Sequence, residues 1–269
     1  MEDRNHDKTD TAGGQIHPTA VVHKGAQVDF DVVVGPGSVV GPNVVVGRGC
    51  RIGAHVLIDG YTTIGENNSF FTGAVVGSQP QDLKYRGGKS HLVIGNNNTV
   101  REYATINTST SEENATRIGN DNLLMAYAHV AHECSIHNGV ILANNATLGG
   151  HVTVEDRAIF GGLAAVQQFV RVGTMSIVGG CSKVIKDVLP YSMVDGCPTT
   201  WQGVNFVGLK RNGVPEEVRA NIKKALKVIC RSSLNTSQAL ERLRAEFDSC
   251  AEIDHLIEFI EKSSRGICK

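Results

Sequence analysis

Histidine residues in the middle of the chain are the groups best suited to proton-transfer chemistry. The 269-residue sequence gathers His129, His132, His137 and His151, and Glu133 directly follows the second of them. An unperturbed imidazole titrates near neutral pH, so it can take a proton from a substrate hydroxyl, and a neighbouring carboxylate can orient the ring. The cluster therefore indicates general-base catalysis. Each histidine taken alone could equally be a solvated polar residue.

A six-residue repeat of aliphatic residues must position these side chains. Ile, Val or Phe occupies every sixth position from Ile16 to Val76, and the same phase, now with Leu among the residue types, continues from Ile94 to Ile106 and from Ile118 to Val184. An α-helix repeats its apolar residues every three to four positions and a strand alternates, so this period excludes both. The repeat predicts a parallel β-helix of hexapeptides, with three hexads in each 18-residue triangular coil. Its left hand is implied by resemblance to other hexapeptide prisms.

The 18-residue coil converts sequence spacing into proximity. His132, Gly150 and Gln168 are 18 residues apart, so we expect them in one column on successive coils, with Glu133 and His151 in the neighbouring column. His132 could then act as the base, while the Gly150 amide stabilises the oxyanion of a tetrahedral intermediate. This arrangement suits acyl transfer to a hydroxyl group without a covalent enzyme intermediate.

Two interruptions of the repeat keep its phase because they replace whole hexads. Residues 82–93 and 112–117 are therefore expected to be loops extruded from otherwise continuous coils. The first loop and its edge carry Asp82, Lys84 and Tyr85, a density of hydrogen-bonding groups that favours ligand binding. Surface decoration is the alternative.

The hexads stop near residue 190, where helical spacing begins. We expect a disordered polar tail over residues 1–14, the β-helix over 15–190 and a small α-helical domain over 191–269. Helices should open at Pro215 and near Ser237, with a third following them. The first helix carries a basic outer face that could be merely solvated or could steer an acidic protein partner: Arg219, Lys223, Lys224, Lys227 and Arg231.

Composition limits the classes of partner and compartment. The 26 basic and 27 acidic residues nearly cancel, so no overall field points to nucleic acid. The seven cysteines are scattered without a Cys-x-x-Cys pair, which favours a reducing compartment and predicts no metal site; Cys134 is expected to pack rather than react. We find no apolar stretch for a signal peptide or a transmembrane segment.

Several sequence blocks resemble the UDP-N-acetylglucosamine 3-O-acyltransferase family, which performs the first step of lipid A synthesis. The resemblance extends from about His17 to Arg265. The blocks that carry it occur in this order: Gln81–Tyr85, Asn122–Met125, Ala128–Cys134, Ile141–Leu148, Gly149–His151, Val178–Ser182 and Gly208–Arg211.

This resemblance implies an activity and an assembly. It implies a homotrimer of left-handed β-helices with active sites between subunits, and no cofactor. Acyl carrier protein would deliver a 3-hydroxyacyl thioester to the 3-hydroxyl of UDP-N-acetylglucosamine. The implied location is the cytoplasm, or an organelle matrix such as that of a mitochondrion if a transit peptide has been removed.

The resemblance also implies roles for the residues of the histidine cluster. By matching motif, His132 is the general base and Glu133 orients it, while Gly150 is the oxyanion donor. His129 and His151 are substrate contacts.

Further substrate-binding roles are implied outside that cluster. Asp82 and Lys84 would reach the sugar or the pantetheine from an adjacent subunit, and Gln168, Asn205 and Arg211 would hold the nucleotide and its phosphates.

One glycine is implied to set the length of the acyl chain. Gly180 matches the position that limits chain length, and glycine there resembles family members that accept long chains. The chain departs from the family pattern at Gln167, Asn107 and Val207, none of which is the proposed base.

Three other interpretations remain open at the level of the sequence. A γ-class carbonic anhydrase is also a trimeric hexapeptide prism, with zinc-binding histidines spaced like His132 and His137. A non-catalytic β-helix scaffold would make the histidines decorative. The related N-acyltransferase of the same pathway carries an extra amino-terminal domain before its hexads.

Overall fold

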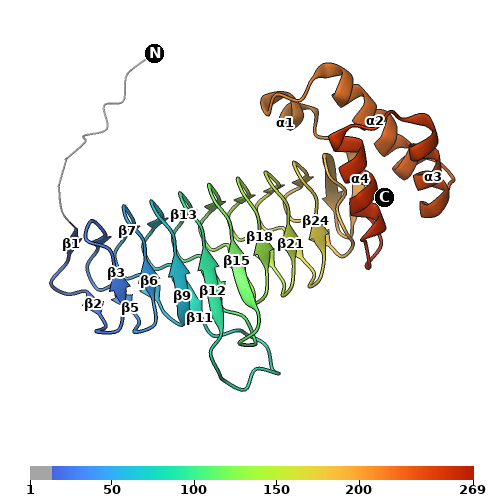
Figure 1. Ribbon diagram of the computed structural model, residues 1–269. Helices are drawn as coiled ribbons and strands as arrows, with labels where there is room; N and C mark the ends of the chain where they lie inside the picture. The colour runs from blue at the N-terminus through green and yellow to red at the C-terminus, as the bar shows by residue number, and fades with distance from the viewer. Residues whose placement is uncertain (1–13) are drawn as a thin grey trace, which may run out of the picture.

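The larger part of the protein is a three-sided prism of short parallel strands (Figure 1). The computed structural model describes residues 14–269. The strands of each face lie in chain order along the prism, and every face is one sheet. Sheet A contains β1 (Gln15–Ile16), β4 (Val33–Val34), β7 (Arg51–Ile52), β10 (Ser69–Phe70), β13 (Thr99–Val100), β16 (Leu123–Leu124), β19 (Ile141–Leu142), β22 (Ile159–Phe160) and β25 (Ile177–Val178). Sheet B contains β2 (Val21–Val22), β5 (Val39–Val40), β8 (Leu57–Ile58), β11 (Val75–Ser78), β14 (Thr105–Asn107), β17 (His129–Val130), β20 (Thr147–Leu148), β23 (Ala165–Val166) and β26 (Lys183–Val184). Sheet C contains β3 (Gln27–Val28), β6 (Val45–Val46), β9 (Tyr61–Ile64), β12 (His91–Ile94), β15 (Ala115–Ile118), β18 (Ser135–Ile136), β21 (Thr153–Val154) and β24 (Arg171–Val172).

The aliphatic residue of each hexad points into the prism, as the repeat predicted. The in-phase residues from Val34 to Val184 are buried, and the aromatic rings of Phe70 and Phe160 fill the same interior. Burial of these stacked columns is the main stabilising contribution, at about 25 cal/mol per Å² of apolar surface. Ile16 is 51% exposed because, within residues 14–269, no coil lies beneath the first one. The coils turn left-handed, against the usual preference for right-handed crossovers.

Two loops leave the prism, with bounds that differ from the expected ones. They comprise residues 79–90, between β11 and β12, and 108–114, between β14 and β15, where 82–93 and 112–117 were expected. The bounds differ because β12 and β15 begin before their hexad phase. The extra residues of β12 pair with β9, as in His91 with Tyr61, and those of β15 pair with β12, as in Ala115 with His91.

The segment expected to be helical opens instead with a β-hairpin. Strands β27 (Ser192–Gly196) and β28 (Thr199–Val204) are antiparallel, and β27 extends sheet A by pairing with β25. Helical spacing gave no sign of this hairpin, which closes the end of the prism.

Four helices follow the hairpin and pack around a second apolar core. They are α1 (Phe206–Arg211), α2 (Glu216–Arg231), α3 (Thr236–Glu246) and α4 (Ala251–Glu261). Their core includes Ile222, Leu226 and Phe259. Helix α1 was not predicted, whereas Pro215 stands directly before α2 and an Asn235–Gln238 capping box opens α3.

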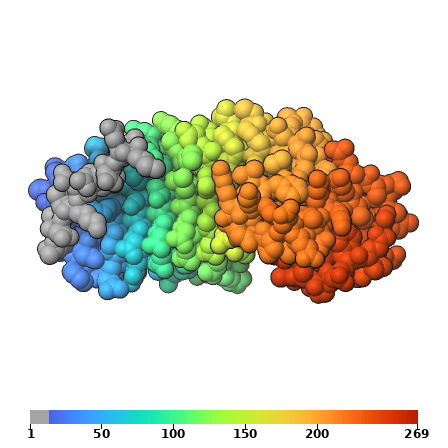
Figure 2. Space-filling model, turned by 90° about the horizontal axis from the view of Figure 1, so that it is seen from above, coloured from blue at the N-terminus to red at the C-terminus, as the bar shows by residue number. Residues whose placement is uncertain are grey.

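The prism and the helices lie end to end in an elongated molecule (Figure 2). Among the helices of residues 14–269, none is long and apolar enough to cross a membrane. The predicted tail lies, except for Gly14, outside the described residues.

Candidate active site

One edge of the prism, the corner where sheet B turns into sheet C, carries the residues expected to do chemistry. Loops 79–90 and 108–114 leave from this corner, and the turns at 131–134, 149–152 and 167–170 follow on successive coils. We refer to these five segments as the B–C corner. The fold thus brings loop and turn residues that are far apart in sequence onto one edge.

His132 and Glu133, the pair to which the sequence assigns catalytic roles, are in contact within a single turn. His132 Nδ1 lies 2.5 Å from Glu133 Oε2. The other carboxylate oxygen, Oε1, accepts hydrogen bonds from the Thr110 backbone N–H at 2.6 Å and from its hydroxyl at 2.7 Å. Glu133 has a left-handed backbone, with φ of 52°, and its N–H donates to Thr116 Oγ1. One hydrogen-bond network therefore connects four residues: His132, Glu133, Thr110 and Thr116.

The ionisation of Glu133 determines which nitrogen of the His132 ring carries the proton. Burial acts to raise the pKa of Glu133, but the hydrogen bonds from Thr110 and His132 outweigh it and lower that pKa. An ionised carboxylate can only accept hydrogen bonds, so Nδ1 of His132 carries the proton. In the neutral imidazole Nε2 is then the nitrogen with the lone pair, and it faces the Asp82 carboxylate at 3.8 Å.

Gly150 lies directly against the His132 ring, as the column argument predicted. A Cβ atom at this position would stand 2.4 to 3.0 Å from three ring atoms, so any larger residue displaces the imidazole. Within residues 14–269 no acceptor takes the Gly150 N–H. It therefore offers a free donor beside the base.

His151 and Phe169 extend the neighbouring column. The His151 N–H donates to the His132 carbonyl oxygen at 2.9 Å. The His151 ring meets the His132 ring edge-on, with centroids 5.2 Å apart, and stacks on Phe169 at 4.5 Å. Its Nε2 lies 3.9 Å from Glu133 Oε2.

His129 and Cys134 lie nearby but differ in character from the pair. His129 Nδ1 is 2.7 Å from Thr105 Oγ1, and burial, followed by the charge of His132, lowers the pKa of His129. Burial raises the pKa of the Cys134 thiol to about 12, and this thiol donates to the Gly149 carbonyl oxygen. Cys134 packs as expected and is a poor nucleophile.

The first loop approaches the site of its own chain. Asp82 Oδ1 accepts from the Lys84 N–H at 2.8 Å, and this turn directs Oδ2 toward His132. Within one chain, the loop therefore brings the Asp82 carboxylate to the His132 ring. The expectation that Asp82 and Lys84 serve the site of an adjacent subunit stays a prediction. Lys84 is exposed.

The other predicted binding residues lie at several places. Gln168 is exposed on the B–C corner, one coil beyond Gly150, whereas Gly180 lies on the corner that joins sheet A to sheet B. Asn205 is the N-cap of α1, and Arg211 is the last residue of that helix. The Asn205 side chain is buried, accepts from Gly208 N–H and donates to the Met175 carbonyl oxygen, so both ends of its amide are already used.

Sequence reasoning missed Thr110, Thr116 and Phe169. Phe169 lies 18 residues after His151 and could have been found from the column. Thr110 lies on an extruded loop outside the hexad phase, where sequence spacing predicts no neighbour.

Three side chains of the histidine cluster lie close enough together to bind a metal ion. One atom each of His132, Glu133 and His151 lie within 4.8 Å of one another. Both Glu133 oxygens already accept hydrogen bonds, and His137, which the carbonic anhydrase interpretation requires, is exposed and outside this group. The geometry thus gives little support to the zinc interpretation.

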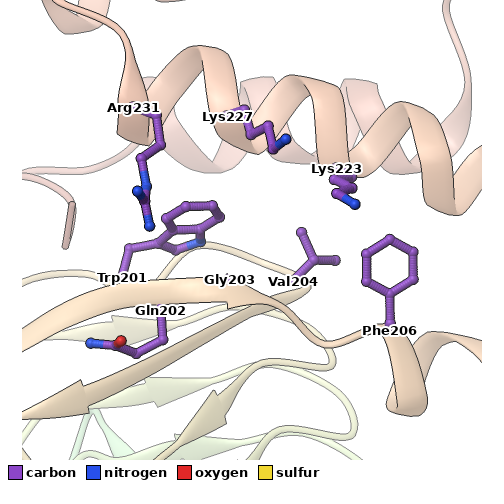
Figure 3. A pocket seen from close by; sticks show the side chains of 8 residues that line it. All are labelled: Trp201, Gln202, Gly203, Val204, Phe206, Lys223, Lys227 and Arg231. Carbon is purple, nitrogen blue, oxygen red and sulfur yellow. The ribbon is translucent and has the colours of Figure 1, made fainter.

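A basic groove of about 480 Å³ lies between β28 and α2 (Figure 3). The Arg231 guanidinium stands 5.5 Å from the centre of the Trp201 ring, and Lys223 Nζ stands 5.3 Å from that of Phe206. Lys227 lies between the two cations on the same helix. The groove combines aromatic surface with positive charge.

Comparisons with known proteins agree with this architecture. A family model described as Udp N-acetylglucosamine O-acyltransferase, domain 2, matches residues 187–268. A model of six bacterial transferase hexapeptide repeats matches residues 115–150, and one of the GMPPB C-terminal domain matches residues 16–111.

Relatives match over nearly the whole chain. A protein of Gloeothece citriformis, named acyl-(acyl-carrier-protein)–UDP-N-acetylglucosamine O-acyltransferase, is 50% identical over 93% of this chain and 90% of its own length. A protein of the same name from Synechocystis is 49% identical over 94% and 92%. The crystal structure of a UDP-N-acetylglucosamine acyltransferase from Bacteroides fragilis superposes with a TM-score of 0.93 at 39% identity, covering 95% of this chain and 100% of that one. With such identity over such coverage, the chain belongs to the UDP-N-acetylglucosamine O-acyltransferase family.

Proposed function

We propose that this protein transfers a 3-hydroxyacyl group from acyl carrier protein to the 3-hydroxyl of UDP-N-acetylglucosamine, with His132 as the general base. The observation that carries this assignment of roles is the pair of His132 and Glu133, which engages Nδ1 of the ring and leaves Nε2 without a hydrogen bond within residues 14–269, beside Gly150. Relatives that bear the acyltransferase name match nearly the whole chain and support the reaction class.

The geometry supports a direct transfer mechanism. His132 Nε2 takes the proton of the acceptor hydroxyl as its oxygen attacks the thioester carbonyl. The Gly150 N–H would donate to the oxyanion of the tetrahedral intermediate. When the carbon–sulfur bond breaks, His132 returns the proton to the departing thiolate, which completes the reaction without a covalent enzyme intermediate.

The basic groove is a suitable docking site for the carrier. Lys223, Lys227 and Arg231 form a positive stripe on α2, and the groove floor offers the indole of Trp201. An acidic carrier protein would be steered to this stripe by electrostatic attraction, so its apparent KM should rise with ionic strength.

The remaining roles are part of the same proposal. Gln168 and Arg211 are exposed and available to a nucleotide, whereas Asn205 would act by holding α1 in place. Gly180 would set the length of the acyl chain. We place the protein in the cytoplasm as a homotrimer, in keeping with the free cysteines of residues 14–269.

Transfer of labelled acyl groups tests this function. Wild type and His132→Ala should be compared with acyl carrier proteins that carry hydroxyacyl chains of different lengths. We expect product from the wild type and a loss of about 10²- to 10⁴-fold in kcat for His132→Ala, because the hydroxyl then loses its base.

A matched control is His137→Ala, which removes an exposed histidine outside the site. This control should retain wild-type activity. A folded wild-type protein that gives no product with any chain length would refute the function, and full activity of His132→Ala would support a scaffold instead.

A further inference from the structure

We propose that Thr110 is a positioning residue for the catalytic pair, and that loop 108–114 serves to hold it against Glu133. This inference rests on the proposed function, since it assigns a role within the same site. Thr110 does not touch the base itself. It acts through the carboxylate that orients the base.

The hydrogen bonds of Glu133 are divided between two partners. Oε1 accepts both donors of Thr110, at 2.6 and 2.7 Å, and Oε2 accepts His132 Nδ1 at 2.5 Å. Thr110 thereby fixes the plane of the carboxylate and reserves Oε2 for the imidazole. The two donors also stabilise the ionised form that a buried carboxylate would otherwise disfavour.

Buried hydroxyl groups hold Thr110 in this position. Ser109 accepts from the His91 N–H and donates to the carbonyl oxygens of Ser111 and Asn114, all at 2.9 Å. Thr108 pairs with the Ser90 hydroxyl at 2.8 Å. The neighbours of Thr110 are therefore anchored to the prism, and its own donors are aimed outward at Glu133.

The same loop also restrains the loop on the opposite side of the pair. Glu112 Oε1 accepts from the Lys89 N–H at 3.0 Å, and Lys89 lies on loop 79–90, which brings Asp82 to His132 Nε2. Loop 108–114 thus controls the Nδ1 side of the imidazole directly and reaches the Nε2 side through Glu112. The groups at both ring nitrogens of His132 are therefore positioned with the help of loop 108–114, which is an insertion into the hexad repeat.

Thr110→Val is the decisive variant because it removes the hydroxyl but keeps the shape and the backbone N–H. We expect kcat to fall about tenfold with KM little changed, as for the loss of one hydrogen bond to a charged group. The pKa of Glu133 should rise, so the acidic limb of the pH profile of kcat should move to higher pH. Thr110→Ser should restore most of the activity.

Thr153→Val is the matched control, since Thr153 lies on β21 and its hydroxyl makes no hydrogen bond within residues 14–269. It should leave kcat and the pH profile unchanged. A Thr110→Val enzyme with the wild-type kcat and pH profile would overturn the proposal. So would activity that falls only in step with the folded fraction while the profile stays in place.

A readout without substrate separates this proposal from the function itself. The proton on His132 Nδ1 should give a downfield NMR resonance in the wild type, which disappears in Glu133→Gln and moves in Thr110→Val. An unchanged resonance in Thr110→Val would reject the positioning role even if no acyl transfer were found. Absence of transfer together with a shifted resonance would reject only the function.

Discussion

Two corners of the same prism carry columns of polar residues, yet only one of them has the features of an active site. At the B–C corner, His132 Nε2 makes no hydrogen bond within residues 14–269 and only faces Asp82 at 3.8 Å. At the corner that joins sheet C to sheet A, which we call the C–A corner, Asn68, Asn98 and Asn122 stack inside the prism and bond to one another. One column is open to a ligand and the other is closed.

The hydrogen bonds of Asn98 show how complete the closed column is. Its Nδ2 donates to Asn68 Oδ1 and to the Gly119 carbonyl oxygen, both at 2.9 Å. Its Oδ1 accepts from the Nδ2 and backbone N–H of Asn122 at 2.9 and 3.0 Å. No polar atom of the side chain is left for a ligand, so the ladder is structural.

Backbone strain does not distinguish the two corners. Left-handed residues occur at Asn97 and Asp121 on the C–A corner as well as at Glu133 and His151 on the B–C corner. The difference lies in unsatisfied polar atoms and in the extruded loops. A polar column in a β-helix is therefore better judged by what its side chains leave free than by its composition.

Breaking the closed column should produce the largest loss of stability. Asn98→Leu leaves the Asn122 backbone N–H and the Gly119 carbonyl oxygen without the partners they have in Asn98, whereas Asn68 Oδ1 keeps the backbone N–H of residue 98. This loss should lower the free energy of unfolding by about 3 kcal/mol. The kcat of the folded protein should stay unchanged. Denaturant titration alongside the transfer assay measures both quantities.

Asn96→Ala provides the control on the same corner. The Asn96 side chain is exposed and accepts one hydrogen bond, from the Glu66 N–H, so its removal should cost less than about 1 kcal/mol. Equal destabilisation by the two variants would remove the distinction between inner and outer asparagines. A large fall in kcat for Asn98→Leu would link the closed column to catalysis.

The prism and the column of His132 and Gly150 could be predicted from sequence because both follow from one local period. Aliphatic residues at six-residue intervals fix which side chains enter the core, and an 18-residue coil then places Gly150 against His132. Nothing beyond the phase of the repeat is needed for either conclusion.

Features without that period could not be predicted. Thr110 reaches Glu133, 23 residues later, from a loop held by hydrogen bonds of Thr108 and Ser109 to Ser90 and the His91 N–H. Both segments lie where the hexad repeat is interrupted, so its phase does not predict these contacts. The approach of Asp82 to its own chain depends on the same kind of tertiary contact. The hairpin at 192–204 adds β27 to sheet A by pairing with β25, a contact outside the hexad repeat that its local sequence pattern does not indicate.

The proposed activity of the B–C corner should be sensitive to the addition of a single methyl group. Gly150→Ala places a Cβ within 2.4 Å of the His132 ring, so the ring must move, and we expect kcat/KM to fall about 10- to 100-fold with little change in thermal stability. In a His132→Ala background the methyl meets no ring, and the additional loss should vanish. Losses that simply add in the double variant would show that Gly150 acts on something other than the imidazole.

The smallest predicted effect concerns a titratable pair at the helical end of the C–A corner. Glu155 Oε2 accepts from Thr174 and lies 2.8 Å from Nε2 of His255 on α4, while Arg171 lies 3.6 Å from Glu155 Oε1. The hydrogen bond to Glu155 raises the pKa of His255. Burial acts to raise the pKa of Glu155, but the hydrogen bonds from His255 and Thr174 outweigh it and lower that pKa. The pair joins the prism to the helical domain.

The two pKa shifts determine how the stability contributed by the His255–Glu155 pair changes with pH. The raised pKa of His255 gives stability that is fully present below about pH 6.5 and is lost as pH rises through the folded-state value. The lowered pKa of Glu155 gives stability that is present above about pH 4.5 and is lost only in stronger acid. His255→Gln should therefore cost most between these values, roughly 1 kcal/mol for this partly exposed pair, and less at alkaline pH. Thermal unfolding from pH 4.5 to 9, with His137→Gln as the control, measures the difference. A difference in thermal stability between wild type and His255→Gln that stays constant across this pH range would contradict the prediction. The imidazole would then stabilise the junction by packing alone, and its titration would contribute nothing.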